Sequence, residues 1–231
     1  MDPARTAASA GFDVAQADRL LTTTRAVRKR LDLARPVDLD VVLDCLRRAI
    51  QAPTGGNIQG WRWMVVDDPS VRAGLADLYR RSFEPYIASR REVIATRGGD
   101  TGERVVRSSE YLADHLHDVP VHVIPCVLGR LPERPSTADC AGFFGSVLPA
   151  AWSFILALRS RGLGSVFTTL HLVYEKEAAE LLGIPDTVTQ VGLIPVAHTI
   201  GADFRPAARR PIEEITYRNR WKSPVVAADP A

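Results

Sequence analysis

Residues 52–61 read Ala-Pro-Thr-Gly-Gly-Asn-Ile-Gln-Gly-Trp, and this stretch joins a predicted helix to a predicted strand. Before it, apolar side chains recur at helical spacing over residues 39–50, with Asp38 placed to cap the helix and Pro53 to stop it. After it, residues 61–66 are aromatic and β-branched, which favours a strand. A helix, a glycine turn and a strand therefore meet at this point of the chain.

The turn carries groups that suit a flat heteroaromatic ligand. Its glycines let such a ligand approach the backbone, and Asn57 and Gln59 offer hydrogen-bond donors and acceptors to a ring edge. A phosphate-cradling nucleotide loop does not fit, because tryptophan and arginine follow Gly60 where lysine and serine or threonine are required. Taken alone, the stretch is also typical of an ordinary glycine turn.

Helical and strand patterns alternate along the rest of the chain, which indicates an α/β or α+β fold. The patterns predict a helix capped by Asp68 with a buried stripe up to Tyr79, a strand at 121–128, an apolar helix at 144–161 with Pro149 in its first turn or at a kink, a β-type run at 165–170, a helix at 175–182 and a strand at 188–196.

The length and hydrophobic content suit one domain. The chain has 231 residues, of which 46% are hydrophobic, enough to bury a substantial core. We expect a single domain over residues 18–231 after a flexible arm, because residues 1–17 are small and polar. Residues 84–109 are rich in arginine and glutamate with weak periodicity, which indicates an exposed excursion or lid that shapes a substrate pocket.

The charge balance argues against nucleic acid and membrane surfaces as partners. The chain has 29 basic and 27 acidic residues, a formal charge of +2, so it lacks the broad positive field that such partners require. Cys45, Cys126 and Cys140 form no CxxC pair and are expected to be free thiols in a reducing cytoplasm. The first residues lack the apolar core of a secretory signal, so we expect a cytoplasmic protein that binds a small molecule or another protein.

One segment, residues 141–158, contains no charged side chain and approaches the length needed to cross a bilayer. It also contains glycines, serines and a proline. A helix buried on all sides, or shared across a dimer interface, suits this composition better than a lone membrane span.

Residues 25–30 read Arg-Ala-Val-Arg-Lys-Arg and place four cations in six residues. A helical turn here would direct Arg25 to the same side as Arg28 and Lys29. Arginine grips phosphate oxygens with two donors and lysine adds a point charge, so the cluster suits a phosphomonoester cofactor. A solvated basic face or a targeting patch remains the alternative.

The order of these motifs resembles the nitroreductase family. An arginine-rich opening, a helix, an Ala-Pro-Thr turn with asparagine and glutamine, and then tryptophan and a strand follow one another as in that family. Residues 161–165, Arg-Gly-Leu-Gly-Ser, resemble its helix-ending glycine turn, and residues 209–214, Arg-Arg-Pro-Ile-Glu-Glu, are similar to its basic C-terminal signature. The resemblance covers Thr22 to Trp221.

The resemblance implies a mixed sheet flanked by helices, an intertwined homodimer, and two FMN sites built from both protomers. For the FMN phosphate and ribityl chain, it implies contacts from Arg25, Ala26, Arg28, Lys29 and Arg209. For the isoalloxazine ring, it implies a ledge contributed by the partner subunit and made of Pro53, Thr54, Gly55 and Asn57. It places Thr168, Thr169 and Leu170 by the reactive nitrogen of the ring, chiefly through their backbone donors.

Three positions qualify this correspondence. His171 follows the presumed flavin strand and is expected to touch the substrate. Ala26 replaces the usual serine of the family, which removes one phosphate hydrogen bond. Gly60 stands where proline normally follows glutamine, and it loosens the turn.

No protein nucleophile is predicted, because a Gly-x-Ser-x-Gly elbow is missing from the sequence. No metal site is predicted either, since His115 and His117 lie two residues apart and point to different faces of a helix. The chemistry is therefore expected to reside in the flavin, without a catalytic side chain. It would take hydride from NADH or NADPH and reduce a nitroaromatic, a quinone or a related small aromatic acceptor by a ping-pong mechanism.

Two alternatives stay open at this point. The same motifs fit equally well the branches of the family that reductively dehalogenate aromatics or that fragment the flavin itself. A non-catalytic protein that sequesters flavin is the third possibility. The physiological acceptor and the preference between NADH and NADPH depend on loops such as residues 84–109.

Overall fold

The computed structural model describes residues 11–225, without the side chains of residues 95, 97 and 98. The chain forms two compact units: a main unit, Thr24–Asp203, and a terminal unit composed of Met1–Thr23 and Phe204–Ala231. Residues 1–10 of the predicted flexible arm lie outside the described residues, and its residues 14–17 belong to a helix, α1 (Val14–Thr23). The terminal unit also contains α7 (Ile212–Ile215).

The main unit combines helices with one antiparallel sheet. Its strands are β1 (Leu31–Asp32), β2 (Trp61–Val66), β3 (Val121–Leu128), β4 (Leu163–Ser165), β5 (Val188–Gln190) and β6 (Ile194–Thr199). Its helices are α2 (Leu39–Ala49), α3 (Pro69–His115), α4 (Thr137–Gly145), α5 (Leu148–Ser160) and α6 (Glu175–Leu182), with short 3-10 turns η2 (Gly55–Asn57), η3 (Leu116–Asp118) and η4 (Leu170–Tyr174). The predicted α+β class is confirmed.

The sheet follows the order β1-β6-β3-β2, with β4 paired to β6 and β5 to β3. Every described strand pair runs antiparallel. The longest pairing joins β2 to β3, from Trp61 opposite Val127 to Val66 opposite His122. Both strands have the bounds that the sequence predicts, because each is rich in aromatic or β-branched residues.

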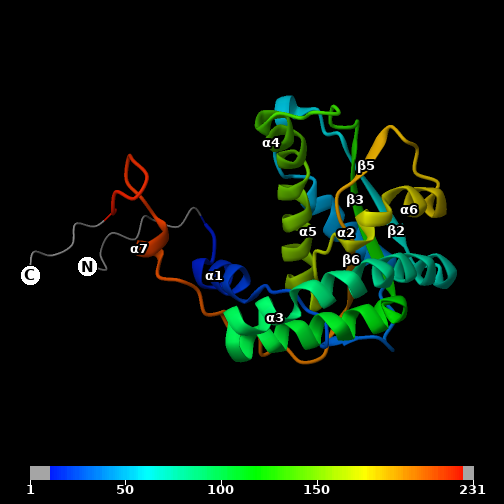
Figure 1. The fold of residues 1–231 in the computed structure, drawn as a ribbon, viewed down its shortest axis with the longest axis horizontal. Helices are drawn as coiled ribbons and strands as arrows, with labels where there is room; N and C mark the ends of the chain where they lie inside the picture. The colour runs from blue at the N-terminus through cyan, green and yellow to red at the C-terminus, as the bar shows by residue number, and fades with distance from the viewer. Residues whose placement is uncertain (1–10, 226–231) are drawn as a thin grey trace, which may run out of the picture. The chain divides into compact units, whose positions relative to one another are not determined.

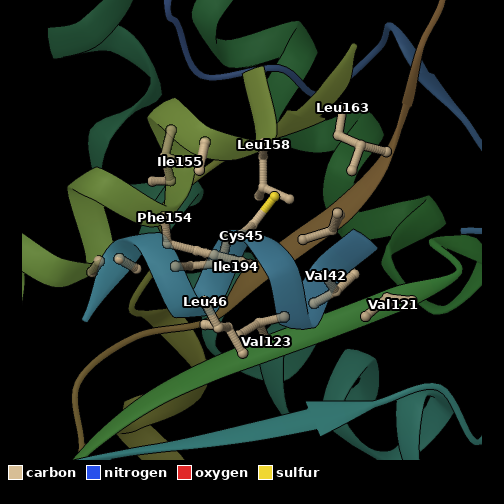
Figure 2. Packing of buried hydrophobic residues seen from close by; sticks show 14 residues of the cluster. Val42, Cys45, Leu46, Val121, Val123, Phe154, Ile155, Leu158, Leu163 and Ile194 are labelled. Carbon is tan, nitrogen blue, oxygen red and sulfur yellow. The ribbon is translucent and has the colours of Figure 1, made fainter. Parts of the chain in front are cut away.

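One face of the sheet is covered by α2 and α5. Figure 2 shows Cys45 and Leu46 of α2 among Phe154 and Leu158 of α5 and side chains of the sheet such as Val123. The helix α2 begins at Asp38, whose side chain accepts a hydrogen bond from the N–H of Asp40, as predicted. This helix directly precedes the 52–61 turn, so its packing in the core fixes where the turn begins.

The opposite face carries α3 and α6. Figure 1 shows α5 and α6 on opposite sides of β3. Side chains alternate along a strand, so His122 and Cys126 point away from Val121 and Val123, which pack against α2 and α5. This second face is therefore the one that holds buried polar side chains.

Residues 84–109, predicted as an exposed excursion or lid, are helical. The helix α3 starts at its Asp68 cap and passes through Pro85 to Gly99, where a φ of 49° and a ψ of −139° break it. Figure 1 shows α3 as two arms lying side by side, and an ion pair between Arg91 and Glu110 joins the arms. The weak apolar periodicity of this segment is explained by its mostly exposed side chains, not by irregular backbone.

Two elements predicted as continuous are broken. The apolar helix at 144–161 consists of α4 and α5, separated at Ser146 and Val147, and Pro149 lies in the first turn of α5 as predicted. The strand at 188–196 splits into β5 and β6 around Gly192, because one extra residue lies there between the pairs Gln190–Cys126 and Ile194–Val123 with β3. A Cβ at Gly192 would stand 2.5 Å from Cζ of Phe167.

The segment Thr137–Ser160 is long and apolar enough to cross a membrane by length and composition. In the fold it is interrupted between α4 and α5, and 39% of its most apolar 18-residue stretch is buried. Such a segment is equally typical of a core helix in a protein without membrane spans.

Candidate functional site

The basic segment at residues 25–29 lies beside β4. The N–H of Val27 donates to the carbonyl of Ser165 at 2.9 Å, and the Val27 side chain is buried. The segment lies outside the helices, because α1 ends at Thr23 and a turn follows at residues 29–30, so the expected helical turn is wrong. With Val27 turned into the core, Arg25, Ala26 and Lys29 are exposed while Arg28 is half-buried.

Arg28 reaches the side of α3. Burial lowers the pKa of its guanidinium, and its electrostatic neighbours are the hydroxyl groups of Tyr79 and Tyr86. Arginine keeps its charge in such surroundings. A half-buried cation whose electrostatic neighbours among the described residues are hydroxyl groups suits an anionic ligand.

Tyr79 of α3 is a neighbour of both Arg28 and Thr168. The Tyr79 side chain is 3% exposed, and burial raises the pKa of its hydroxyl. Arg28 and Thr168 are far apart in the sequence, and both act on this hydroxyl. Sequence reasoning assigned Tyr79 only to the buried stripe of a helix, because its spacing carries no sign of these neighbours.

Lys29 lies over a different aromatic ring. Its Nζ is 6.0 Å from the ring centroid of Tyr111, on the second arm of α3. The two neighbouring cations of the basic segment therefore face the two arms of α3, Arg28 the first and Lys29 the second.

The turn at 168–170 is held by the sheet. The N–H of Thr168 donates to the carbonyl of Leu193 at 3.0 Å, and the N–H of Leu193 donates back at 2.7 Å. The N–H of Thr168 is therefore engaged within the protein. Thr169 is exposed, and its carbonyl accepts from the N–H of Leu172, which leaves Thr169 and Leu170 at the edge of the fold.

The 52–61 turn is mostly exposed, and two of its residues have strained backbone conformations. Asn57 and Gln59 have φ values of 55° and 52°, in the left-handed region that non-glycine residues rarely adopt. Such residues concentrate at functional sites because surrounding contacts must hold them there. The Nε2 of Gln59 donates to Oδ1 of Asn57 at 3.1 Å, and the Gln59 N–H donates to Oγ1 of Thr54 at 3.2 Å.

A further contact anchors this turn to the apolar helices. The N–H of Gly55 donates to Oγ of Ser146 at 3.3 Å, at the break between α4 and α5. Ser146 was not among the predicted site residues. At the tip, Ile58 is 80% exposed. The turn thus presents an apolar side chain and backbone to the outside of its own chain.

The two segments predicted to contact the ring pack against the same hydrophobic cluster. Ala52, before the turn, and Phe167, before Thr168, both pack against the cluster that contains Trp61 and Val147. The predicted cofactor residues of the main unit are nevertheless open to solvent in one chain. Two cavities, of about 500 and 970 Å³, lie elsewhere in the main unit, and none of the predicted cofactor residues lines them.

His171, the predicted substrate contact, is fully buried in this chain. It follows Leu170 in η4 and lies beside the side chain of Gln190, and burial lowers its pKa to about 4. Neither of its ring nitrogens reaches hydrogen-bonding geometry, although the Gln190 amide is adjacent. His122 is a buried neighbour, and its pKa is also lowered to about 4 by burial.

Arg209 belongs to the terminal unit, where it is exposed and its Nη1 donates to the carbonyl of Ala208 at 3.0 Å. Its meeting with Arg25 at one phosphate remains a prediction. Among the described residues, no group of three or more histidine, cysteine or carboxylate side chains is placed to hold a metal ion.

Solved structures with this fold include several flavoproteins. Iodotyrosine deiodinase bound to FMN and 3-iodo-L-tyrosine has a TM-score of 0.64 and 22% identity, over 88% of this chain and 98% of that chain. A BluB-like flavoprotein from Clostridium difficile 630 has a TM-score of 0.65 and 17% identity, over 88% and 99%. The FMN- and NADPH-dependent nitroreductase NfnB from sphigopyxis sp. strain HMH has a TM-score of 0.62 and 21% identity, over 89% and 99%.

These similarities confirm the predicted nitroreductase-like fold. The family model described as the Nitroreductase family matches residues 21–198, from the end of α1 to β6. That span includes the basic segment, the 52–61 turn and the 168–170 turn. By this match, the chain belongs to the nitroreductase family.

Proposed function

We propose that this protein binds FMN and acts, as a homodimer, as an NAD(P)H-dependent oxidoreductase of small aromatic acceptors. Membership of the nitroreductase family supports an oxidoreductase. The observation that carries the proposal is the placement of Arg28: a half-buried cation beside Tyr79, whose electrostatic neighbours among the described residues are the hydroxyls of Tyr79 and Tyr86. An anionic cofactor supplies the charge that this arrangement lacks.

The residues present fit FMN. The exposed cations Arg25 and Lys29 would hold the phosphate and ribityl chain, with Arg209 added from the terminal unit. Arg28 would lie near the ring, since Arg28 and Thr168 are both neighbours of Tyr79. Ala26 is exposed and would contribute only its backbone.

Bound FMN would supply two-electron chemistry, taking hydride from a nicotinamide and passing electrons to the acceptor. The chain's own groups would orient the ring and provide positive charge beside it. Thr169 and Leu170 would line the ring at the edge of the fold. His171 would act on the substrate only through this turn, because its side chain is buried beneath it.

A second copy of the chain would close the site. The exposed 52–61 turn would lie against the ring bound by the partner subunit, through Pro53, Thr54, Gly55 and Asn57. An apolar surface next to it supports such a dimer: Leu148 and Trp152 of α5 are 41% and 47% exposed, and Leu43 of α2 is 41% exposed. Exposed apolar side chains gathered in this way mark interaction surfaces.

Replacing Trp152 by alanine should weaken the dimer about 30-fold, because a large aromatic side chain at an interface commonly contributes about 2 kcal/mol. Sedimentation velocity over a range of protein concentrations measures the effect. Val105 is 40% exposed on the second arm of α3 and serves as the matched control, Val105→Ala. Equal dissociation constants for both variants would place the dimer interface elsewhere.

The absorption spectrum of the purified protein tests the cofactor and the reaction. We expect a yellow protein that takes up added FMN, bleaches rapidly with NADH or NADPH, and recovers its colour on addition of a nitroaromatic or a quinone. Rates that vary with both substrates in parallel double-reciprocal lines would indicate ping-pong turnover.

The same measurement separates the alternatives. Slow bleaching with fast turnover of a halogenated phenol would identify a reductive dehalogenase, and loss of FMN itself in air would identify flavin fragmentation. Tight FMN binding without bleaching by either nicotinamide would identify a sequestering protein. A colourless protein that is indifferent to FMN would overturn the proposal.

A reducing cytoplasm suits the cysteines. All three are free, and Cys45 and Cys126 are buried. Burial raises the pKa of the Cys126 thiol to about 12, so it stays protonated and unreactive.

A further inference from the structure

Ser146 lies at the break between α4 and α5 and connects this break to the 52–61 turn. Its Oγ accepts a hydrogen bond from the N–H of Gly55 at 3.3 Å and donates one to the carbonyl of Gly142 at 2.8 Å. A hydroxyl that donates and accepts at the same time is fixed in its orientation. One side chain thus joins the end of α4 to the segment predicted to contact the isoalloxazine ring.

The turn has few other hydrogen bonds to the rest of the main unit. At its beginning, the N–H of Ala52 donates to the carbonyl of Ala49 in α2 at 3.1 Å. At its end, the N–H of Leu128 in β3 donates to the carbonyl of Gly60 at 2.9 Å. Between these two ends, the hydrogen bonds found among the described residues attach the turn to the rest of the chain only at Ser146.

This attachment matters because the backbone of the turn is strained. Asn57 and Gln59 have positive φ values, and non-glycine residues keep such conformations only where neighbouring contacts hold them. The bonds from Gln59 to Asn57 and to Thr54 lie within the turn. They fix the shape of the turn but not its position, which the contact with Ser146 sets.

The close approach of Ser146 also explains the glycine at position 55. A Cβ at Gly55 would stand 3.3 Å from Oγ of Ser146, closer than most Cβ contacts in proteins. The glycine therefore lets the backbone of the turn come within hydrogen-bonding distance of the hydroxyl. Gly55 is also predicted to contact the ring, so the anchored group and the predicted ring contact belong to the same residue.

Apolar packing fixes the position of Ser146 itself. The next residue, Val147, is fully buried in the cluster that contains Trp61, and Ala52 packs against the same cluster. The α4–α5 break and both ends of the turn therefore contact one set of apolar side chains. Ser146 is thus held at a defined place relative to the turn.

We propose that Ser146 is a positioning residue of the cofactor site, whose hydroxyl sets the position of the 52–61 turn against the isoalloxazine ring bound by the partner subunit. This inference rests on the proposed FMN function. Ser146 would act on the ring, because Arg25 and Lys29 are the residues proposed to hold the phosphate and ribityl chain. Without the hydroxyl, the turn would occupy its productive position for a smaller fraction of the time, and the apparent flavin affinity would fall by that fraction.

Ser146→Ala removes the hydroxyl and should lower the FMN affinity about fivefold, the effect of one neutral hydrogen bond. The affinity for riboflavin, which lacks the phosphate, should fall by the same factor. The visible circular dichroism of bound FMN should change as well, because the surroundings of the ring change. Ser146→Thr keeps a hydroxyl and should restore both the affinity and the spectrum.

Ser160→Ala is the matched control, at the other end of α5. The Ser160 hydroxyl also donates to a carbonyl of its own helix, that of Ala157 at 2.9 Å, and accepts from Nη1 of Arg161 at 3.0 Å. Its loss should change the melting temperature about as much as Ser146→Ala does. The flavin affinity and the dichroism spectrum of this control should equal those of the unmodified protein.

A mixed dimer tests the action of Ser146 across the interface. Ser146→Ala chains and Arg28→Ala chains are co-expressed with different affinity tags, and the mixed dimer is isolated. One of its two sites should bind FMN with the affinity of the unmodified protein, because that site takes Arg28 from one chain and the intact turn from the other. A mixed dimer without such a site would overturn the proposal.

The outcomes distinguish this inference from the proposed function. If the unmodified protein binds FMN and bleaches with NAD(P)H, but Ser146→Ala matches Ser160→Ala in affinity and spectrum, the positioning role is wrong and the proposed function stands. A loss of affinity for FMN alone, with riboflavin bound as before, would also contradict the role, because the effect would then lie at the phosphate. If the unmodified protein binds no flavin, both the proposed function and this inference are overturned.

Discussion

Replacing Arg28 by alanine should weaken FMN binding by about 100-fold, or about 3 kcal/mol, the scale of a charge-assisted contact in a partly buried site. The guanidinium is half-buried, and its electrostatic neighbours among the described residues are the hydroxyls of Tyr79 and Tyr86. A bound anion would compensate its charge. Titration of FMN with protein, followed by the quenching of FMN fluorescence, measures the affinity.

Two further variants sharpen this experiment. Arg28→Lys keeps a positive charge but loses the planar fork, so it should recover part of the affinity. Arg134→Ala removes an exposed arginine in the loop before α4 and should leave FMN binding unchanged. An Arg28→Ala protein that binds FMN as tightly as the Arg134→Ala protein would show that Arg28 does not face the cofactor.

The free energy of unfolding should fall steeply between pH 6.5 and pH 4 because of His122 and His171. Both side chains are completely buried, and burial lowers the pKa of each from 6.5 to about 4. The unfolded chain binds a proton at each position in this window, whereas the folded chain does not. Stability is thus complete above pH 6.5 and is lost as the pH falls towards 4.

The expected size is about 3 kcal/mol for each histidine, since one pKa unit corresponds to 1.36 kcal/mol. The two rings interact with each other, and Arg72 adds a positive charge near His122, so protonation of either ring opposes that of the other. Their contributions should therefore not add independently. Nε2 of His122 is 2.9 Å from the carbonyl of Leu116, a hydrogen bond that offsets only part of the cost of burial.

Urea unfolding at pH 7.5, 5.5 and 4.5, without added FMN, measures this dependence. His171→Gln should reduce the loss between pH 7.5 and pH 4.5 by about 3 kcal/mol, whatever its effect at pH 7.5. His117→Gln is the control, because the His117 side chain is 44% exposed beside Asp118. A His171→Gln protein that loses as much stability as the His117→Gln protein would contradict this account.

Several elements follow from local patterns alone. The strands β2 and β3, the helix α6 and the caps at Asp38 and Asp68 agree with the sequence prediction, because each depends on neighbouring residues in the chain. The cation cluster and the glycine turn were recognised for the same reason. Their residue types carry their chemistry wherever the fold places them.

Other features depend on contacts between distant residues. The break in the 188–196 strand arises where its register against β3 changes by one residue, and no local pattern encodes that pairing. The place of residues 25–29 depends on β4, because the N–H of Val27 donates to the carbonyl of Ser165. His171 is buried although its sequence position suggested an exposed substrate contact.

The sequence by itself therefore determined the α+β class, the family and the inventory of cations and turns, since periodicity and motif order are properties of neighbouring residues. Only the tertiary structure decided that Arg28 is half-buried beside Tyr79, and that the Tyr79 side chain is 3% exposed. Such neighbours meet only when α3 packs in the folded chain. That packing is a property of the folded chain as a whole.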